Sequence, residues 1–371
     1  MSQSLLRPLM PELNSLRGLA CLAVLLFHGF WWYIPASATG IEGWLRDATF
    51  QGFRGVNLFF ILSGLLITNI LLGGRARPDY FAHFYKRRAL RILPAYYMLL
   101  ALLAIYGVSR QFLGISFLYA ANMAPLLGIK MGYGPLWSLG VEEQFYLFWP
   151  LIIRRFRSRT IAFVAVGLLA NSILLSLGLH TSSPQATFPI WHAAHGLALG
   201  ALLSLFLCSS MGNRTNVGSV ASALAILGGA LLLLSGYSKK PQIAGSMQIG
   251  WDLILAGLLL SVLLLGSSRF EAVVRPKLLL FFGDISYGLY LIHVLVFMVY
   301  RRVLHPGDGL AAVLIQFLLC SVVAIGIASL SRFTVEAWFL TLKDRKLEIA
   351  APQWVIDLAS SIEQHFPKLA K

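Results

Sequence analysis

A histidine and an arginine share one face of the first long apolar segment, and the pair suits proton-transfer chemistry. Arg17 and His28 are 11 residues apart, and 11 helical steps of about 100° end roughly 20° from the starting direction. The same interval carries His28 about 16 Å along the helix. An imidazole at that depth can serve as a general base. We therefore take His28 as a candidate base, although a histidine that only hydrogen-bonds between helices is the commoner case.

A basic cluster precedes the third apolar segment. It runs from Lys86 to Arg91, and Arg88 and Arg91 lie three residues apart on one helix face. Guanidinium groups bind phosphate oxygens in a fork, so this pair could clamp a phosphorylated ligand. Part of the cluster is explained by its role as an orientation signal in a membrane.

Two adjacent carboxylates, Glu142 and Glu143, open another apolar segment, and Tyr146 follows one turn later. Ionisable groups in such segments are costly and mark a function or a buried pair. An acid–base role and carboxylates that face water at the interface are almost equally good explanations.

A polar stripe crosses a later apolar segment. Ser286, Tyr290 and His293 recur at i, i+4 and i+7, so they share a face that must meet protein or a water-filled cavity. Hydrogen bonding between helices explains the stripe slightly better than direct chemistry. His192 and His195 have a spacing compatible with metal ligation, but no acidic or cysteine partner has a fixed spacing, and we expect no metal site.

The elements that must position these residues are membrane helices. Of the 371 residues, 58% are hydrophobic and 12% are charged, which excludes both an ordinary soluble domain and a disordered chain. Ten segments are long enough to span a bilayer, which takes about 20 apolar residues. They cover 13–34, 53–72, 91–109, 135–153, 160–178, 191–208, 218–236, 249–267, 278–300 and 310–331. The sequence predicts an all-α polytopic transmembrane bundle, and a further apolar stretch at 112–127 has an uncertain depth.

The placement of positive charge predicts the orientation. The net charge is +15, which in a membrane protein indicates basic cytoplasmic loops and gives no reason to expect a nucleic-acid partner. With ten spans and the N-terminus inside, 22 of the 30 Lys and Arg residues are cytoplasmic, and so are both termini. An eleventh span at 112–127 would invert every later loop.

The chain divides into a membrane domain over residues 1–346 and a short cytoplasmic tail over 347–371. Apolar residues recur in the tail near helical spacing, which predicts an interfacial amphipathic helix. The first apolar segment has features of a cleavable signal peptide, but a long preceding region that contains Glu12 favours an uncleaved helix. The three cysteines, Cys21, Cys208 and Cys320, are widely spaced and predict no disulfide framework.

Taken together, these segments resemble the acyltransferase 3 family of integral membrane acyltransferases. The matching pieces occur in family order over about residues 10–335. They are Arg17 with His28, Gly55 to Ile67, Arg88 and Arg91 with Leu93-Pro94, Trp137 to Pro150, and Ser286 to His293. Asn57 stands where the family usually has Asp, and residues 192–195 lie where it often has Arg and Asp, so the acceptor is not identified.

The resemblance implies a multi-pass protein of the bacterial inner (plasma) membrane in a stand-alone form, without the extracytoplasmic esterase-like domain that some members carry. Its activity would be transfer of an acetyl or other short acyl group from acyl-coenzyme A, with acetyl-CoA as the donor. The acceptor would be a hydroxyl of a glycan, either a cell-surface polysaccharide or its lipid-linked precursor. By resemblance His28 is the catalytic histidine, and Arg17, Arg88 and Arg91 serve the donor side.

Other roles stay open. Tyr290 and Ser286 are candidates for stabilising an oxyanion, and Glu142 or Glu143 could orient the histidine or bind sugar hydroxyls. We group Tyr290, Glu142 and Glu143 with the catalytic residues and Ser286 and His293 with substrate binding. Acyl transfer could be direct or could pass through an acyl-histidine. The alternative function is a transporter or translocase of a lipid-linked sugar or small molecule.

Overall fold

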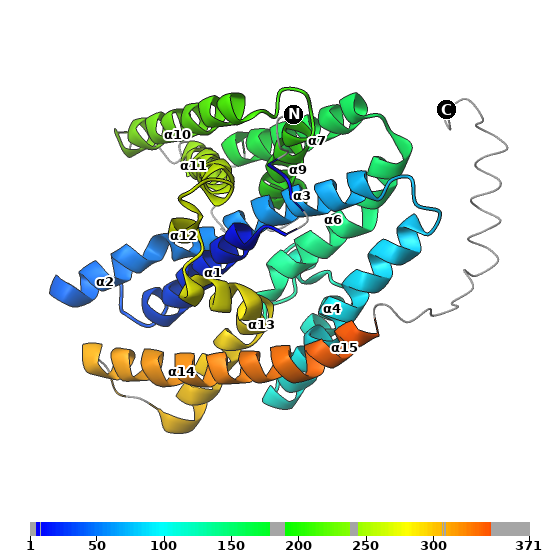
Figure 1. The fold of residues 1–371 in the computed structure, drawn as a ribbon. Coiled ribbons are helices and arrows are strands. Elements are labelled where there is room, and N and C mark those ends of the chain that lie inside the picture. The colour runs from blue at the N-terminus through cyan, green and yellow to red at the C-terminus, as the bar shows by residue number, and fades with distance from the viewer. Residues whose placement is uncertain are drawn as a thin grey trace.

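The computed structural model describes residues 5–342 except residue 8, 179–189, 238–243, 306 and 308. The predicted tail at 347–371 and the domain boundary at 346 therefore lie outside the described residues. Within them the chain is helical and contains no strand, which confirms the predicted all-α class. The helices, shown in Figure 1, are α1 (Pro11–Leu26), α2 (Gly40–Phe50), α3 (Gly55–Gly73), α4 (Tyr80–Tyr106), α5 (Arg110–Phe117), α6 (Leu136–Arg155), α7 (Ser158–Gly178), α8 (Ile190–Ala193), α9 (His195–Leu207), α10 (Arg214–Tyr237), α11 (Ala244–Gly266), α12 (Glu271–Val274), α13 (Lys277–Leu304), α14 (Leu310–Ser331) and α15 (Ala337–Thr341).

Each of the ten predicted spans coincides with helix. Eight helical segments of the described chain are long and apolar enough to cross a membrane by length and composition. The other two predicted spans correspond to α6, which carries Glu142 and Glu143, and to α8 with α9, of which α9 has only 13 residues. The total of ten spans and the orientation of the termini stay predictions.

The stretch at 112–127 does not form a spanning helix. It contains α5, of 8 residues, and a short 3-10 turn at Ala121–Met123. Eight helical residues extend only about 12 Å, far less than the thickness of a bilayer. The segment is nonetheless packed into the protein, because Phe112, Ala121 and Asn122 are all fully buried. Buried non-helical backbone of this kind is compatible with a membrane protein.

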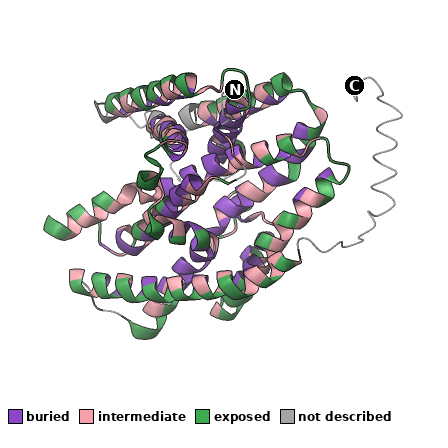
Figure 2. Cartoon of the chain, viewed as in Figure 1, coloured by how far each residue is buried: buried purple, intermediate pink, exposed green. Residues whose placement is uncertain are grey.

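The centre of the bundle is formed by α1, α3 and α13. Figure 2 shows buried residues concentrated there, whereas α10 and α14, at opposite edges of the view, are largely exposed. More than half of the most apolar window of each central span is buried, against less than a third in α7, α10 and α14. Apolar helices that expose so much surface are typical of contact with lipid.

Glycines allow the central helices to approach closely. A Cβ atom added at Gly18 of α1 would lie 2.1 Å from the carbonyl oxygen of Leu279 in α13. Cβ atoms added at Gly64 of α3 and Gly200 of α9 would lie 2.0 and 2.1 Å from the carbonyl oxygens of Leu197 and Ile61. Small residues at such contacts are the usual device of helix packing in membranes.

Two π-helical segments interrupt the regular helices. Phe27–Trp31 extends α1 and contains His28, and Arg332–Glu336 joins α14 to α15. Between α3 and α4 the turn outside the membrane is fixed by Arg77, which donates to both carboxylate oxygens of Asp79 at 2.9 and 3.0 Å. This hydrogen bonding holds the pKa of the Asp79 carboxyl below its usual value.

Candidate active site

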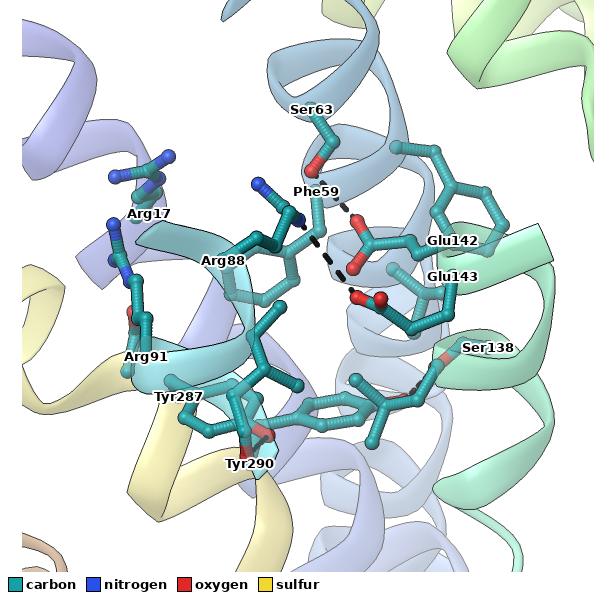
Figure 3. Close-up of a pocket in the computed structure, with 15 residues that line it drawn as sticks. Arg17, Phe59, Ser63, Arg88, Arg91, Ser138, Glu142, Glu143, Tyr287 and Tyr290 are labelled. Carbon is teal, nitrogen blue, oxygen red and sulfur yellow. Dashed lines mark hydrogen bonds and ion pairs between the residues drawn. The ribbon is translucent and has the colours of Figure 1, made fainter. Parts of the chain in front are cut away.

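A cavity of about 110 Å³ lies among α1, α3, α4, α6 and α13 (Figure 3). Seven of the nine predicted site residues line it: Arg17, Arg88, Arg91, Glu142, Glu143, Ser286 and Tyr290. Apolar side chains of α3, among them Phe59 and Phe60, cover much of the remaining wall. Five helices far apart in sequence thus bring cations, carboxylates and hydroxyls to one space, as an active site or ligand site requires.

The cations differ in how they are neutralised. The Arg88 guanidinium lies 3.4 Å above the centre of the Tyr146 ring, and its Nε is 3.8 Å from Oε1 of Glu143. By contrast, Arg17 and Arg91 make no hydrogen bond or ion pair with any residue that the structure describes. Arg17 is half-buried and Arg91 is exposed. The cavity therefore holds two guanidiniums whose charge a bound anion could neutralise.

The carboxylates are held by groups from other helices. Ser63 Oγ of α3 donates a hydrogen bond of 2.6 Å to Oε1 of Glu142, and Arg88 of α4 pairs with Glu143 (Figure 3). Ser63 and Gly64 are small residues that permit close helix packing, and the sequence did not single out Ser63 as a site residue. Gly64 does so, but Ser63 also belongs to the site, and its small polar side chain beside a glycine was the available signal.

His28 and His293 form a pair. Nδ1 of His28 lies 3.0 Å from the carbonyl oxygen of Val24 and 3.2 Å from Nε2 of His293. Nδ1 of His293 lies 2.9 Å from the carbonyl oxygen of Leu289. Because a carbonyl oxygen only accepts, each neutral ring carries its proton on Nδ1. Nε2 of His293 then accepts from His28, and Nε2 of His28 retains a lone pair, as a general base requires.

Neither histidine lines the cavity. Tyr290 is the side chain that connects them to it, because Tyr290 lines the cavity and its ring centroid is 5.9 Å from that of His293. The Tyr290 hydroxyl shares a hydrogen bond of 2.6 Å with Ser138 Oγ, another cavity residue. The histidine pair is thus separated from the arginine-lined cavity by one aromatic ring.

Arg17 lines the cavity and His28 does not, and the 11 residues between them separate the two side chains by about 16 Å along the helix. The common helix face of Arg17 and His28 stays a prediction. Regular α-helix ends at Leu26, and His28 lies in the wider π turn that follows. An inserted turn of this kind rotates the residues beyond it and is frequent at functional sites.

A second buried polar cluster was not predicted from sequence. Nδ2 of Asn57 donates to Oδ1 of Asp252 at 2.7 Å, and Nε2 of His195 lies 3.1 Å from Oδ2 of the same carboxyl. Asn57, His195 and Asp252 belong to α3, α9 and α11, so no spacing in the sequence could show that they meet. The cluster is separate from the arginine-lined cavity, and it packs three helices together.

A family described as an acyltransferase domain matches residues 10–332. A peptidoglycan O-acetyltransferase of Listeria monocytogenes is 34% identical over 168 residues, which cover 40% of this chain and 24% of that protein. A putative peptidoglycan O-acetyltransferase of Bacillus subtilis is 33% identical over 195 residues, 45% of this chain and 28% of its own. An O-acetyltransferase of Staphylococcus aureus is 27% identical over 320 residues, 76% of this chain and 50% of its own.

These relatives are longer than the region they share with this chain, which spans at most about half of their length. No solved structure matches the chain. The family match covers five sixths of the sequence or more and includes the arginines, the carboxylates and both histidines of the site. The chain, an integral multi-pass membrane protein, therefore belongs to the acyltransferase 3 family.

Proposed function

We propose that this protein is a membrane O-acetyltransferase that transfers an acetyl group from acetyl-coenzyme A to a hydroxyl of a cell-wall glycan. The family match and the three named relatives support the reaction class and the kind of acceptor. The single observation that carries the mechanism is the proton arrangement of His28, whose Nδ1 is engaged by Val24 and His293 while Nε2 keeps its lone pair.

The arginine-lined cavity suits the donor. Arg17 and Arg91 make no ion pair with the described residues, and Arg91 is exposed. Phosphate groups of coenzyme A would neutralise these guanidiniums through bidentate hydrogen bonds. Figure 3 shows Arg17 and Arg91 on the side of the cavity opposite the carboxylates, Arg88 between them and paired with Glu143, and Tyr290 and Ser138 farther along the cavity. The thioester end would reach Tyr290, whose ring it must pass to meet His28.

Acyl transfer then requires two proton transfers, the first to His28 and the second from His28. When bound, acetyl-coenzyme A supplies the electrophilic thioester carbonyl. Nε2 of His28 takes the proton of the acceptor hydroxyl as its oxygen bonds to the carbonyl carbon. The carbon–sulfur bond breaks, and the proton passes from His28 to the departing sulfur, which leaves the histidine neutral. The Tyr290 hydroxyl, now bonded to Ser138, is our candidate donor to the carbonyl oxygen during this step.

Transfer of labelled acetyl groups from acetyl-coenzyme A to isolated glycan in purified membranes tests this function. We expect His28→Ala to abolish transfer at unchanged protein level. His305→Asn is the matched control, since His305 is exposed beyond α13 and asparagine tolerates its positive φ. Transfer that survives in His28→Ala would remove the assigned base. Glycan movement without dependence on coenzyme A would instead support a translocase.

A further inference from the structure

The acceptor must reach Nε2 of His28, the ring nitrogen that does not contact His293. Among the described residues, Nε2 of His28 has no hydrogen-bond partner, and it is not one of the fully enclosed polar atoms that lack one. His28 is also absent from the lining of the arginine-lined cavity. A hydroxyl can therefore approach His28 by a route different from that of the donor.

Trp32 borders His28 on the side away from Arg17. Its ring centroid is 4.8 Å from that of His28, with an interplanar angle of 76°, so the two rings meet edge to face. The indole touches this half-buried histidine, and 45% of Trp32 is exposed. Trp32 follows Arg17 by 15 residues, which places it about 22 Å farther along the chain of helical turns. The indole thus lies beyond His28, toward the opposite side of the membrane from the arginines.

Gly134 borders the same indole and leaves space beside it. A Cβ atom added at Gly134 would meet only the Trp32 ring, at 3.6 Å. The segment that carries Gly134 is held in place by its neighbour Tyr133, whose hydroxyl donates a hydrogen bond of 2.6 Å to the carbonyl oxygen of Leu291 in α13. The glycine therefore leaves the ring of Trp32 uncovered by a side chain at this position.

An exposed indole beside a general base suits a sugar ring. The C–H face of a pyranose is apolar and packs on an aromatic face, while its hydroxyls project at the rim. A tryptophan offers a large rigid surface that loses little conformational entropy on binding. Tryptophan is also common at membrane interfaces for reasons unrelated to ligands. Trp44 of α2 is 68% exposed and serves as the comparison for a tryptophan that only anchors the protein in the membrane.

We propose that Trp32 and Gly134 form the acceptor subsite, where one sugar ring stacks on the indole and directs a hydroxyl to Nε2 of His28. This inference rests on the proposed function and adds the residues that select a saccharide acceptor. The sugar could belong to polymeric glycan or to a lipid-linked precursor, since both present the same ring chemistry.

Steady-state kinetics of acetyl transfer separate the possibilities. Soluble peptidoglycan fragments and a lipid-linked disaccharide serve as acceptors in separate arms, at saturating acetyl-coenzyme A. We expect Trp32→Ala to raise the KM of at least one acceptor about tenfold or more, with a smaller change in kcat. Trp32→Phe retains an aromatic face and should recover much of the loss. Gly134→Leu should act like Trp32→Ala, because the new side chain would cover the Trp32 ring.

Trp44→Ala is the control for membrane anchoring and should leave both constants unchanged. The subsite is refuted if Trp32→Ala matches Trp44→Ala with both acceptors, or if kcat falls while KM stays constant. If transfer by the wild type did not depend on His28, both the proposed function and the subsite would be ruled out. Activity that depends on His28 but is indifferent to Trp32 would remove the subsite alone, and the acceptor arm that responds identifies the source of the sugar.

Discussion

At the scale of single residues, His293 determines which nitrogen of His28 is basic. It is 1% exposed and uses both ring nitrogens, one for Leu289 and one for His28. The sequence placed His293 with substrate binding, but this geometry favours a positioning role. A buried partner of this kind fixes the tautomer and the orientation of a catalytic histidine.

Replacing His293 should therefore lower kcat without weakening donor binding. We expect His293→Leu to reduce kcat about 10- to 100-fold, the range found for residues that orient metal-binding histidines, with an unchanged KM for acetyl-coenzyme A. His293→Gln should recover part of this loss, since its amide oxygen can accept from Nδ1 of His28. Equal rates for the leucine and glutamine variants would contradict a positioning role.

The arginines should not be equivalent in donor binding. Arg88 is engaged by Glu143 and Tyr146, whereas Arg91 is exposed and makes no hydrogen bond or ion pair with the described residues. We expect Arg91→Ala to raise the KM for acetyl-coenzyme A about tenfold and more than Arg88→Ala does, because Arg91 is free to bind phosphate.

Arg87→Ala is the control for net charge. Arg87 belongs to the same basic cluster but is exposed outside the cavity, where it contacts His83 at 3.3 Å. Added salt should raise the KM of the wild type and have less effect on Arg91→Ala, since screening acts on an exposed charge. If Arg87→Ala and Arg91→Ala raise KM equally, the cavity is not the phosphate site.

At the scale of elements, helix positions followed from the sequence, but the contacts between helices did not. Runs of apolar residues predicted ten segments, and each of them coincides with helix, because a bilayer imposes both the length and the composition of a spanning helix. The polar stripe of Ser286, Tyr290 and His293 was also correctly placed on one face of α13 toward the protein interior.

The structural features that the sequence did not predict have a common physical origin. The sequence did not predict the π turn at His28. It also did not predict three contacts between helices, which are Ser63 with Glu142, Arg88 with Glu143 and Asn57 with Asp252. All of these features depend on tertiary packing. Residues on different helices have no fixed spacing in sequence, and a single inserted residue in a helix changes every later direction.

The contact between α3 and α9 should limit stability and activity together. Gly64→Ala places a Cβ atom against the backbone of α9, which flexible side chains cannot relieve. Overpacking of this kind costs about 1–3 kcal/mol. Because Ser63 is the adjacent residue, displacement of α3 should also weaken its hydrogen bond to Glu142. We expect a lower melting temperature in detergent and a lower kcat.

Gly326→Ala of α14 is the control, since a Cβ atom there has no neighbour within 4 Å. It should leave the melting temperature and kcat close to those of the wild type. A melting temperature for Gly64→Ala equal to that of Gly326→Ala would show that the α3–α9 contact can relax, and the close approach would then carry no constraint.

At the scale of the whole molecule, the proposed reaction requires a defined orientation. Coenzyme A is cytoplasmic and a cell-wall glycan lies outside. The arginine-lined cavity must therefore open toward the cytoplasm, and Trp32 must lie toward the outside. The charge distribution predicts this arrangement, with 22 of 30 Lys and Arg residues on the inner side of a ten-span chain. The two sides of the histidine pair would then meet different compartments.

Cysteine labelling in intact cells tests that orientation. Cys21 and Cys320 are buried and Cys208 is exposed, so the single-cysteine variants are built in a background that lacks all three. Ser37→Cys, in the exposed segment after Trp32, should react with a membrane-impermeant maleimide in intact cells. Ala76→Cys, exposed between α3 and α4, should react only after permeabilisation. Its loop precedes α4, the helix that carries Arg88 and Arg91 of the arginine-lined cavity, and is expected on the cytoplasmic side. The reverse pattern would put the donor cavity where coenzyme A is absent, and direct transfer from acetyl-coenzyme A through this site would be impossible.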